Sequence, residues 1–179
     1  EGKTFISLNF SLAMASLNKK VLLIGADLRN PQLHTYANIN KNQRGLSNYL
    51  IDPTLDWESS TMKVFDKQPN HQVLFSGAIP PNPAHLLANG NFETLIKEAK
   101  LVYDYIIVDL APTILVTDTL LVAHLADATI CAIRANHTDK KLIPFSMDLS
   151  KTNRLVNMSY VINGVKENRS YGYNYNYGH

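Results

Sequence analysis

Residues 20–31 have the sequence KVLLIGADLRNP, an unbroken apolar run that ends in a glycine, an aspartate and a polar turn. Short apolar runs rich in Val, Ile and Leu are typical of strands that are buried on both faces of a sheet. Four similar runs follow: QVLFSG (72–77), YDYIIVDL (103–110), ATICAIRA (128–135) and MSYVINGV (158–165). The sequence therefore predicts five buried strands.

Segments of helical length separate these strands, at residues 4–18, 91–102, 117–126 and 139–155. In the first segment, Phe5, Leu8, Leu12 and Ala15 recur at three- and four-residue steps and are expected on one stripe of a helix. Pro144 is expected to delay or kink the last helix. This alternation indicates parallel strands joined by right-handed crossovers, in an open α/β sheet with helices on both faces. Ligands of such sheets bind beyond the carboxyl ends of the strands.

Composition limits the classes of function. A chain of 179 residues, 45% hydrophobic and 18% charged, is expected to form one globular domain. Its net charge of +2 gives no reason to expect nucleic acid as a partner. The sequence contains no long apolar span and no signal peptide, so we expect this segment in the cytoplasm. We expect a domain at residues 1–166 and a flexible tyrosine-rich tail at residues 167–179.

The chain begins with EGKT, directly before the first helical segment. Gly-Lys-Thr at the start of a helix is the second half of the phosphate-binding loop GxxxxGK[ST]. In that loop, backbone N–H groups surround a phosphate, the Lys ammonium reaches the terminal phosphates and the Thr hydroxyl ligates Mg²⁺. The sequence thus predicts a P-loop NTPase-like fold, whose first strand and first half of the loop are expected before Glu1.

Two aspartates follow buried strands. Asp27 comes just after the strand at residues 20–25, and Asp109 lies at the end of the strand at residues 103–110. Either residue alone would be explained as a turn cap. Beside a phosphate loop, however, an aspartate at a strand end holds the metal through its water shell. Because Lys3, Asp27 and Asp109 are all expected at one edge of the sheet, the sequence predicts a Mg–nucleotide site.

With these residues identified, the sequence resembles the bacterial tyrosine autokinases (BY-kinases), the cytoplasmic kinase domains of capsule and exopolysaccharide export regulators. LLIGADLRNP is similar to the family's second nucleotide motif, three apolar residues followed by D-x-D-x-R, and IIVDLAPT is similar to its Walker B strand. RGLSNYL, SGAIPPNPAHLL and VINGV follow in the family's order, and RSYGYNYNYGH resembles its C-terminal tyrosine cluster. The resemblance extends over nearly the whole chain.

The resemblance implies an autokinase that transfers the γ-phosphate of ATP to its own tail and so regulates polysaccharide synthesis and export. Lys3, Asp27 and Asp109 would be catalytic, and Thr4, Asp27 and Asp109 would hold Mg²⁺. The residues that bind the nucleotide would be Glu1, Gly2, Lys3, Thr4, Phe5 and Asn163, with Asn163 near the adenine. The phosphate acceptors would be Tyr171, Tyr173, Tyr175 and Tyr177.

The resemblance also implies partners. These are other copies of the chain in a ring-like homo-oligomer, a membrane polysaccharide co-polymerase domain or activator in the same or another chain, and a tyrosine phosphatase. Such an assembly would lie at the cytoplasmic face of the bacterial inner membrane. Arg29 would anchor the local geometry, or contact phosphate or a neighbouring subunit. His85 is expected to have a surface or packing role.

One position departs from the family pattern. Gly25 stands where the family has the first Asp of D-x-D, a usual candidate for the group that takes the phenol proton. Asp27 would then do both jobs, or catalysis would weaken, because loss of a base typically costs roughly 10²–10⁴-fold in rate. Two alternatives therefore stay open: a ParA/MinD-like ATPase, and a nucleotide-binding scaffold with weakened kinase activity.

Overall fold

The computed structural model describes residues 1–40, 42–112 and 118–166. All five predicted strands are present: β1 (Val21–Gly25), β3 (His71–Leu74), β4 (Tyr105–Asp109), β5 (Thr129–Arg134) and β6 (Met158–Asn163). Their predicted burial holds for β1 and most of β3, but it is wrong for β5 and β6, whose residues are half-buried or exposed. The predicted helices are also present, as α1 (Lys3–Ser16), α5 (Asn91–Ala99), α6 (Asp118–Val122) with the 3-10 turn η2 (Ala123–Leu125), and α7 (Leu142–Lys151). Pro144 lies in the first turn of α7, which begins at Leu142, so the helix starts late in its segment as the proline predicted.

The remaining elements are short. The segment RGLSNYL contains the helix α3 (Leu46–Ile51). The elements that no sequence pattern predicted are α2 (Leu33–Ala37), η1 (Glu58–Ser60), β2 (Thr61–Met62) and α4 (Pro83–Ala88). Each has six residues or fewer, which is too few to show helical periodicity or strand alternation.

The strands form two groups within the described residues. The first is a sheet of order β2-β3-β1-β4, in which β1 is parallel to β3 and β4 while β2 is antiparallel to β3. The second is the parallel pair β5-β6. The mostly parallel arrangement is as predicted, but β4 and β5 share no hydrogen-bonded ladder in the described part of the chain. The register pairs Gly25 with Asp109, so the ends of β1 and β4 lie side by side.

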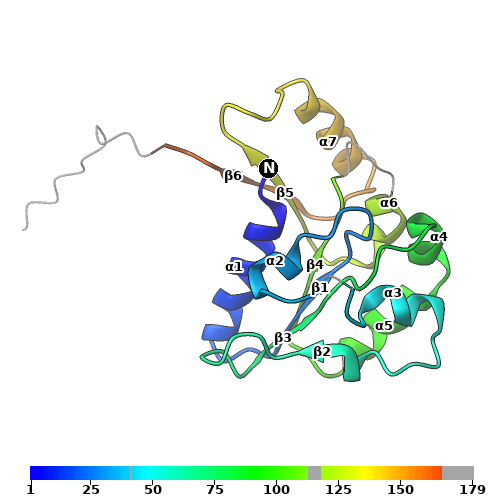
Figure 1. Cartoon of the computed structure of the whole chain (residues 1–179). Coiled ribbons are helices and arrows are strands. Elements are labelled where there is room, and N and C mark those ends of the chain that lie inside the picture. The colour runs from blue at the N-terminus through cyan, green and yellow to red at the C-terminus, as the bar shows by residue number, and fades with distance from the viewer. Residues whose placement is uncertain (41, 113–117, 167–179) are drawn as a thin grey trace, which may run out of the picture.

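Helices cover both faces of the four-stranded sheet, as predicted. Along β1, which is wholly buried, Leu22 and Ile24 pack against α3, α4, α5 and α6, whereas Leu23 packs against α1 and α2. Figure 1 shows these two helical layers on either side of the strands. Each fully buried leucine or isoleucine contributes about 1.5–3 kcal/mol relative to exposure. This three-layer core fixes the carboxyl ends of β1, β3 and β4.

Buried His71 joins α1 to β3. Its Nε2 lies 2.8 Å from the Ser11 hydroxyl, which donates its own hydrogen to the Leu8 carbonyl at 2.7 Å. Nε2–H is therefore the donor to Ser11, and Nδ1 has no hydrogen-bond partner among the described residues. The ring also meets the edge of Phe65. Burial of the ring lowers the pKa of His71 to about 4.

The fold should lose stability in mild acid through His71. Because its folded pKa lies below that of the unfolded chain, the contribution is intact above about pH 6.5 and is lost as pH falls toward 4. The full shift corresponds to about 3 kcal/mol. Urea unfolding should therefore show a steep fall in stability between pH 7.5 and 5, which His71→Leu flattens and which the exposed-site control His85→Gln leaves unchanged. An equally steep fall in His71→Leu would contradict this role.

Candidate active site

The site begins at the N-terminus of α1. Gly2 is its N-cap, in the left-handed region with φ 87° and ψ 30°. A Cβ at Gly2 would displace the side-chain amide of Asn163, and glycine adopts this positive φ with least strain. No side chain in the described part of the chain caps this end. Because the first N–H groups of a helix have no intrahelical acceptor, this end can receive an anion.

Asn163 holds the start of α1 against the end of β6. Its Nδ2 donates to the Glu1 carbonyl at 3.0 Å, and its Oδ1 accepts from the Gly164 N–H at 2.8 Å. The predicted nucleotide residue Asn163 therefore lies directly beside Glu1 and Gly2, far from them in the sequence. In Figure 1 the N-terminus accordingly lies close to β6.

Asp109 is the buried charge of the site, with an exposed fraction of 4%. Desolvation raises the pKa of its carboxyl group to about 6, while the nearby Thr4 hydroxyl and the positive charge of Lys3 act in the opposite direction. The carboxylate of Asp27 is also near enough to raise this pKa. The structure thus brings together Lys3, Thr4, Asp27 and Asp109, as the sequence predicted.

Asp27 lies in a turn beyond β1. Its Oδ1 accepts hydrogen bonds from the backbone N–H groups of Arg29 at 3.2 Å and Asn30 at 3.0 Å. The turn is joined to the end of β4, because the Ala26 N–H donates to the Asp109 carbonyl at 2.8 Å. Asp and Asn commonly organise turns in this way. The result is a carboxylate held at a fixed position beside Asp109.

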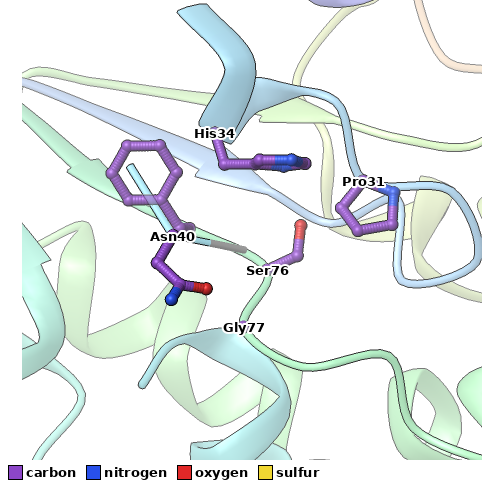
Figure 2. A pocket seen from close by; sticks show the side chains of 6 residues that line it. Pro31, His34, Asn40, Ser76 and Gly77 are labelled. Carbon is purple, nitrogen blue, oxygen red and sulfur yellow. The ribbon is translucent and has the colours of Figure 1, made fainter. Parts of the chain in front are cut away.

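Gly25 is closely enclosed by this chain's own residues. Ser76 donates from its hydroxyl to the Gly25 carbonyl at 2.8 Å. A Cβ at position 25 would lie 3.0 Å from Ser76 Oγ and 3.3 Å from Leu33 Cδ2, so an aspartate here requires a small shift of these neighbours. Figure 2 shows the small adjoining pocket, whose lining residues are Pro31, His34, Asn40, Phe75, Ser76 and Gly77.

Other predicted residues lie elsewhere. Phe5 is 49% exposed, so the stripe expected on α1 is not buried along its whole length. Ser11 is buried instead, together with Leu8 and Ala15, because it pairs with His71. His85 is exposed on α4. The four tail tyrosines lie outside the described residues.

Sequence reasoning missed Asp118, the first residue of α6. Arg29 binds it with two prongs, from Nε to Oδ2 at 2.6 Å and from Nη2 to Oδ1 at 3.0 Å. Arg29 thus anchors the local geometry, which was one of its predicted roles. An aspartate at the start of a helical segment was visible in the sequence, but such residues are common as caps and gave no hint of a distant partner.

Comparison with known proteins identifies the family. A family described as an AAA domain matches residues 1–141. The tyrosine-protein kinase YwqD of Bacillus subtilis is 34% identical over 178 residues, covering 97% of this chain and 72% of YwqD. The chain belongs to the bacterial tyrosine-protein kinase family. The tyrosine-protein kinase CpsD of Streptococcus agalactiae is 30% identical, covering 99% of this chain and 77% of CpsD.

Solved structures agree with this family. The kinase domain of the Escherichia coli tyrosine kinase ETK matches with a TM-score of 0.84 and 30% identity, covering 98% of this chain and 68% of the ETK chain. The septum site-determining protein MinD of Pyrococcus horikoshii matches with a TM-score of 0.70 and 20% identity, covering 90% of this chain and 64% of that one. The likeness to MinD is one of fold, and the kinase interpretation is confirmed.

Some relatives are much longer than this chain. It spans 23% of a putative tyrosine-protein kinase in the cps region of Klebsiella pneumoniae, at 33% identity over 179 residues.

Among the residues that the structure describes, none of the helices has the length and apolar character needed to cross a bilayer.

Removal of the Asp109 charge should raise the free energy of unfolding of the protein without nucleotide. Because the folded pKa is raised above its ordinary value of 3.8, the penalty is full above about pH 6 and absent below about pH 4. Its size is about 3 kcal/mol. Asp109→Asn should therefore unfold at higher urea than wild type at pH 8, with the gain shrinking toward pH 4.5. Asp127→Asn, at an exposed carboxylate, is the control. No gain at pH 8 would contradict a desolvated charge.

Proposed function

We propose that this chain binds ATP with Mg²⁺ and transfers the γ-phosphate to tyrosines of its own C-terminal cluster, Tyr171, Tyr173, Tyr175 and Tyr177. The observation that supports this most is the convergence of Lys3, Thr4, Asp27 and Asp109 at the N-terminus of α1. Membership of the bacterial tyrosine-protein kinase family also supports the proposal. Residues 1–166 form the catalytic domain in this proposal.

The donor atoms at the site suit a hard divalent cation. Thr4, Asp27 and Asp109 offer hydroxyl and carboxylate oxygens, the ligands that Mg²⁺ takes together with water and phosphate. A cation at this position would also neutralise the desolvated negative charge of Asp109. When held by Thr4, Asp27 and Asp109, Mg²⁺ would supply positive charge that neutralises the negative charge developing on the phosphoryl group during transfer. The site therefore fits the metal that the family relationship implies.

The residues divide the chemistry as follows. The N–H groups of Gly2, Lys3 and Thr4 bind phosphate oxygens, and the Lys3 ammonium stabilises the transferring group. Asp27 orients the tyrosine and accepts its phenolic proton as the phenol oxygen bonds to the γ-phosphorus. The bond from that phosphorus to the β,γ-bridging oxygen breaks, and ADP leaves. Phe5 and Asn163 complete the nucleotide-binding set, with Asn163 reaching the adenine side.

The path of the chain supports the tail as acceptor. β6 ends at Asn163, whose side chain touches Glu1, so the residues after it begin beside the phosphate loop. From Val165 to Tyr177 there are 12 steps, which span at most roughly 40 Å when extended. The tail can therefore enter a site of its own subunit or of a neighbour. In a ring-like homo-oligomer, the tail of one subunit would reach the site of the next, so the phosphate would be transferred between subunits.

The proposed setting is regulation of capsular or exopolysaccharide export at the cytoplasmic face of the inner membrane. The names of relatives support it, since they include a kinase in the cps region and a putative tyrosine-protein kinase CapB. A membrane polysaccharide co-polymerase domain would be the activator, and a tyrosine phosphatase would reverse the reaction. Each phosphate adds a charge of about −1.5 to −2, so a phosphorylated cluster would repel itself and loosen the ring.

Lys3→Met should abolish phosphotyrosine. The protein is incubated with ATP and Mg²⁺ and blotted for phosphotyrosine, with Lys19→Met as a control at an exposed lysine beyond α1. Changing all four tail tyrosines to Phe should remove the label while leaving nucleotide binding intact. Label that persists in Lys3→Met would assign the reaction to another kinase. ATP hydrolysis without phosphotyrosine would support the MinD-like ATPase, and binding without either would support the scaffold.

Gly25→Asp should increase transfer. The new carboxylate supplies a second proton acceptor, and general bases typically contribute roughly 10²–10⁴-fold. Ser76→Gly, combined with Gly25→Asp, should enlarge the gain because it removes the hydroxyl that a Cβ would approach. Initial rates of phosphotyrosine formation measure both. Equal rates in wild type and the double variant would show that Asp27 alone suffices as the base.

A further inference from the structure

The Arg29–Asp118 ion pair connects two parts of the site that the sequence keeps apart. Asp118 has a side chain only 3% exposed, whereas the Arg29 side chain is 44% exposed. Both contacts are short and use the planar fork of the guanidinium. A buried carboxylate that is held by two parallel hydrogen bonds has little freedom to move. This geometry fixes Arg29 to the first turn of α6.

The same turn of α6 also holds the chain that follows Asp109. The Thr119 hydroxyl, which is buried, donates to the Ala111 carbonyl at 2.6 Å. Two consecutive residues of α6 therefore bind the turn after β1 and the residues after β4. α6 itself packs against α4 in the core of the sheet. It provides a rigid support for both strand ends.

The turn that Arg29 belongs to is the one that presents Asp27. The Arg29 backbone N–H donates to Asp27 Oδ1, while the Arg29 side chain reaches Asp118. One residue thus contacts the Asp27 carboxylate with its backbone and α6 with its side chain. The contact with Asp118 therefore restrains the residue whose backbone N–H orients this carboxylate.

We propose that Arg29 and Asp118 act as a pair of positioning residues that fixes the Asp27 carboxylate relative to Asp109. This inference rests on the proposed function, because it concerns the same Mg–nucleotide site. It uses Arg29 through the contact with Asp118, which takes two of the five N–H donors of the guanidinium. It gives Asp118 a role in catalysis that acts through Arg29 and Asp27.

The inference predicts equal kinetic losses from unequal structural damage. Arg29→Ala leaves the buried Asp118 carboxylate without its cation, which is strongly destabilising. Asp118→Asn leaves only a half-exposed guanidinium, which water can solvate. Loss of stability should therefore be much larger for Arg29→Ala. Loss of kcat should be similar for both, about 10–100-fold, because misplacement of a reacting group by an ångström has this effect.

The test measures kcat, KM for ATP and the Mg²⁺ concentration for half-maximal phosphotransfer, alongside urea unfolding. Both variants should need more Mg²⁺, with KM for ATP changed less than threefold. Arg29→Lys keeps the charge but not the two-pronged geometry, so it should retain stability and still lose kcat. Lys97→Ala, which removes the exposed 2.8 Å pair with Glu93 on α5, is the matched control and should change none of these values.

Three outcomes would overturn the inference. Wild-type kcat in Asp118→Asn would show that the pair is structural only. A raised KM for ATP in Arg29→Ala alone would make Arg29 a phosphate ligand. The affinity for a fluorescent ATP analogue can be measured with and without Mg²⁺. If Mg²⁺ raises this affinity equally in wild type and Asp118→Asn, the metal site does not depend on the pair. This binding assay needs no transfer, so it remains decisive if wild type forms no Lys3-dependent phosphotyrosine and the proposed function fails.

Discussion

A carboxylate buried at the end of a strand is the constraint on which this site depends. β4 is the end strand of the four-stranded sheet and only its last residue, Asp109, is buried. The fold would be more stable if this residue were neutral, because burial raises the pKa of Asp109 to about 6. The start of α1 compensates in part with Lys3 and Thr4, whereas the neighbouring turn adds a second carboxylate, Asp27, which raises this pKa further. The two carboxylates against one lysine leave an excess of negative charge that favours a bound cation.

The amino-acid sequence was sufficient to predict the strands and the edge at which the site lies. Buried parallel strands are continuous apolar runs, and polar residues follow at their ends, so the pattern alone predicts that Lys3, Asp27 and Asp109 lie together. What could not be predicted depends on contacts between distant residues. Asp118 looks like an ordinary helix cap, and Ser11 interrupts an apolar stripe because it pairs with His71. α2 and α4 are too short for a periodic signal.

Gly25 illustrates how a single departure from a family motif is accommodated. Its missing side chain leaves no large void, because Ser76 and Leu33 close around the position and Ser76 binds the Gly25 carbonyl. The backbone register with Asp109 is kept, so the loss affects the supply of carboxylates and leaves the sheet edge intact.

The contact between Asn163 and Glu1 makes the two ends of the described chain a single mechanical unit. The side-chain amide of Asn163 joins the last strand to Glu1, the residue before Gly2. The same amide lies against Gly2, where a Cβ would displace it. Tension on residues 164–166 would be transmitted through this amide to the cap of α1. A displacement of the end of β6 would therefore change the position of the carbonyl group that precedes Gly2.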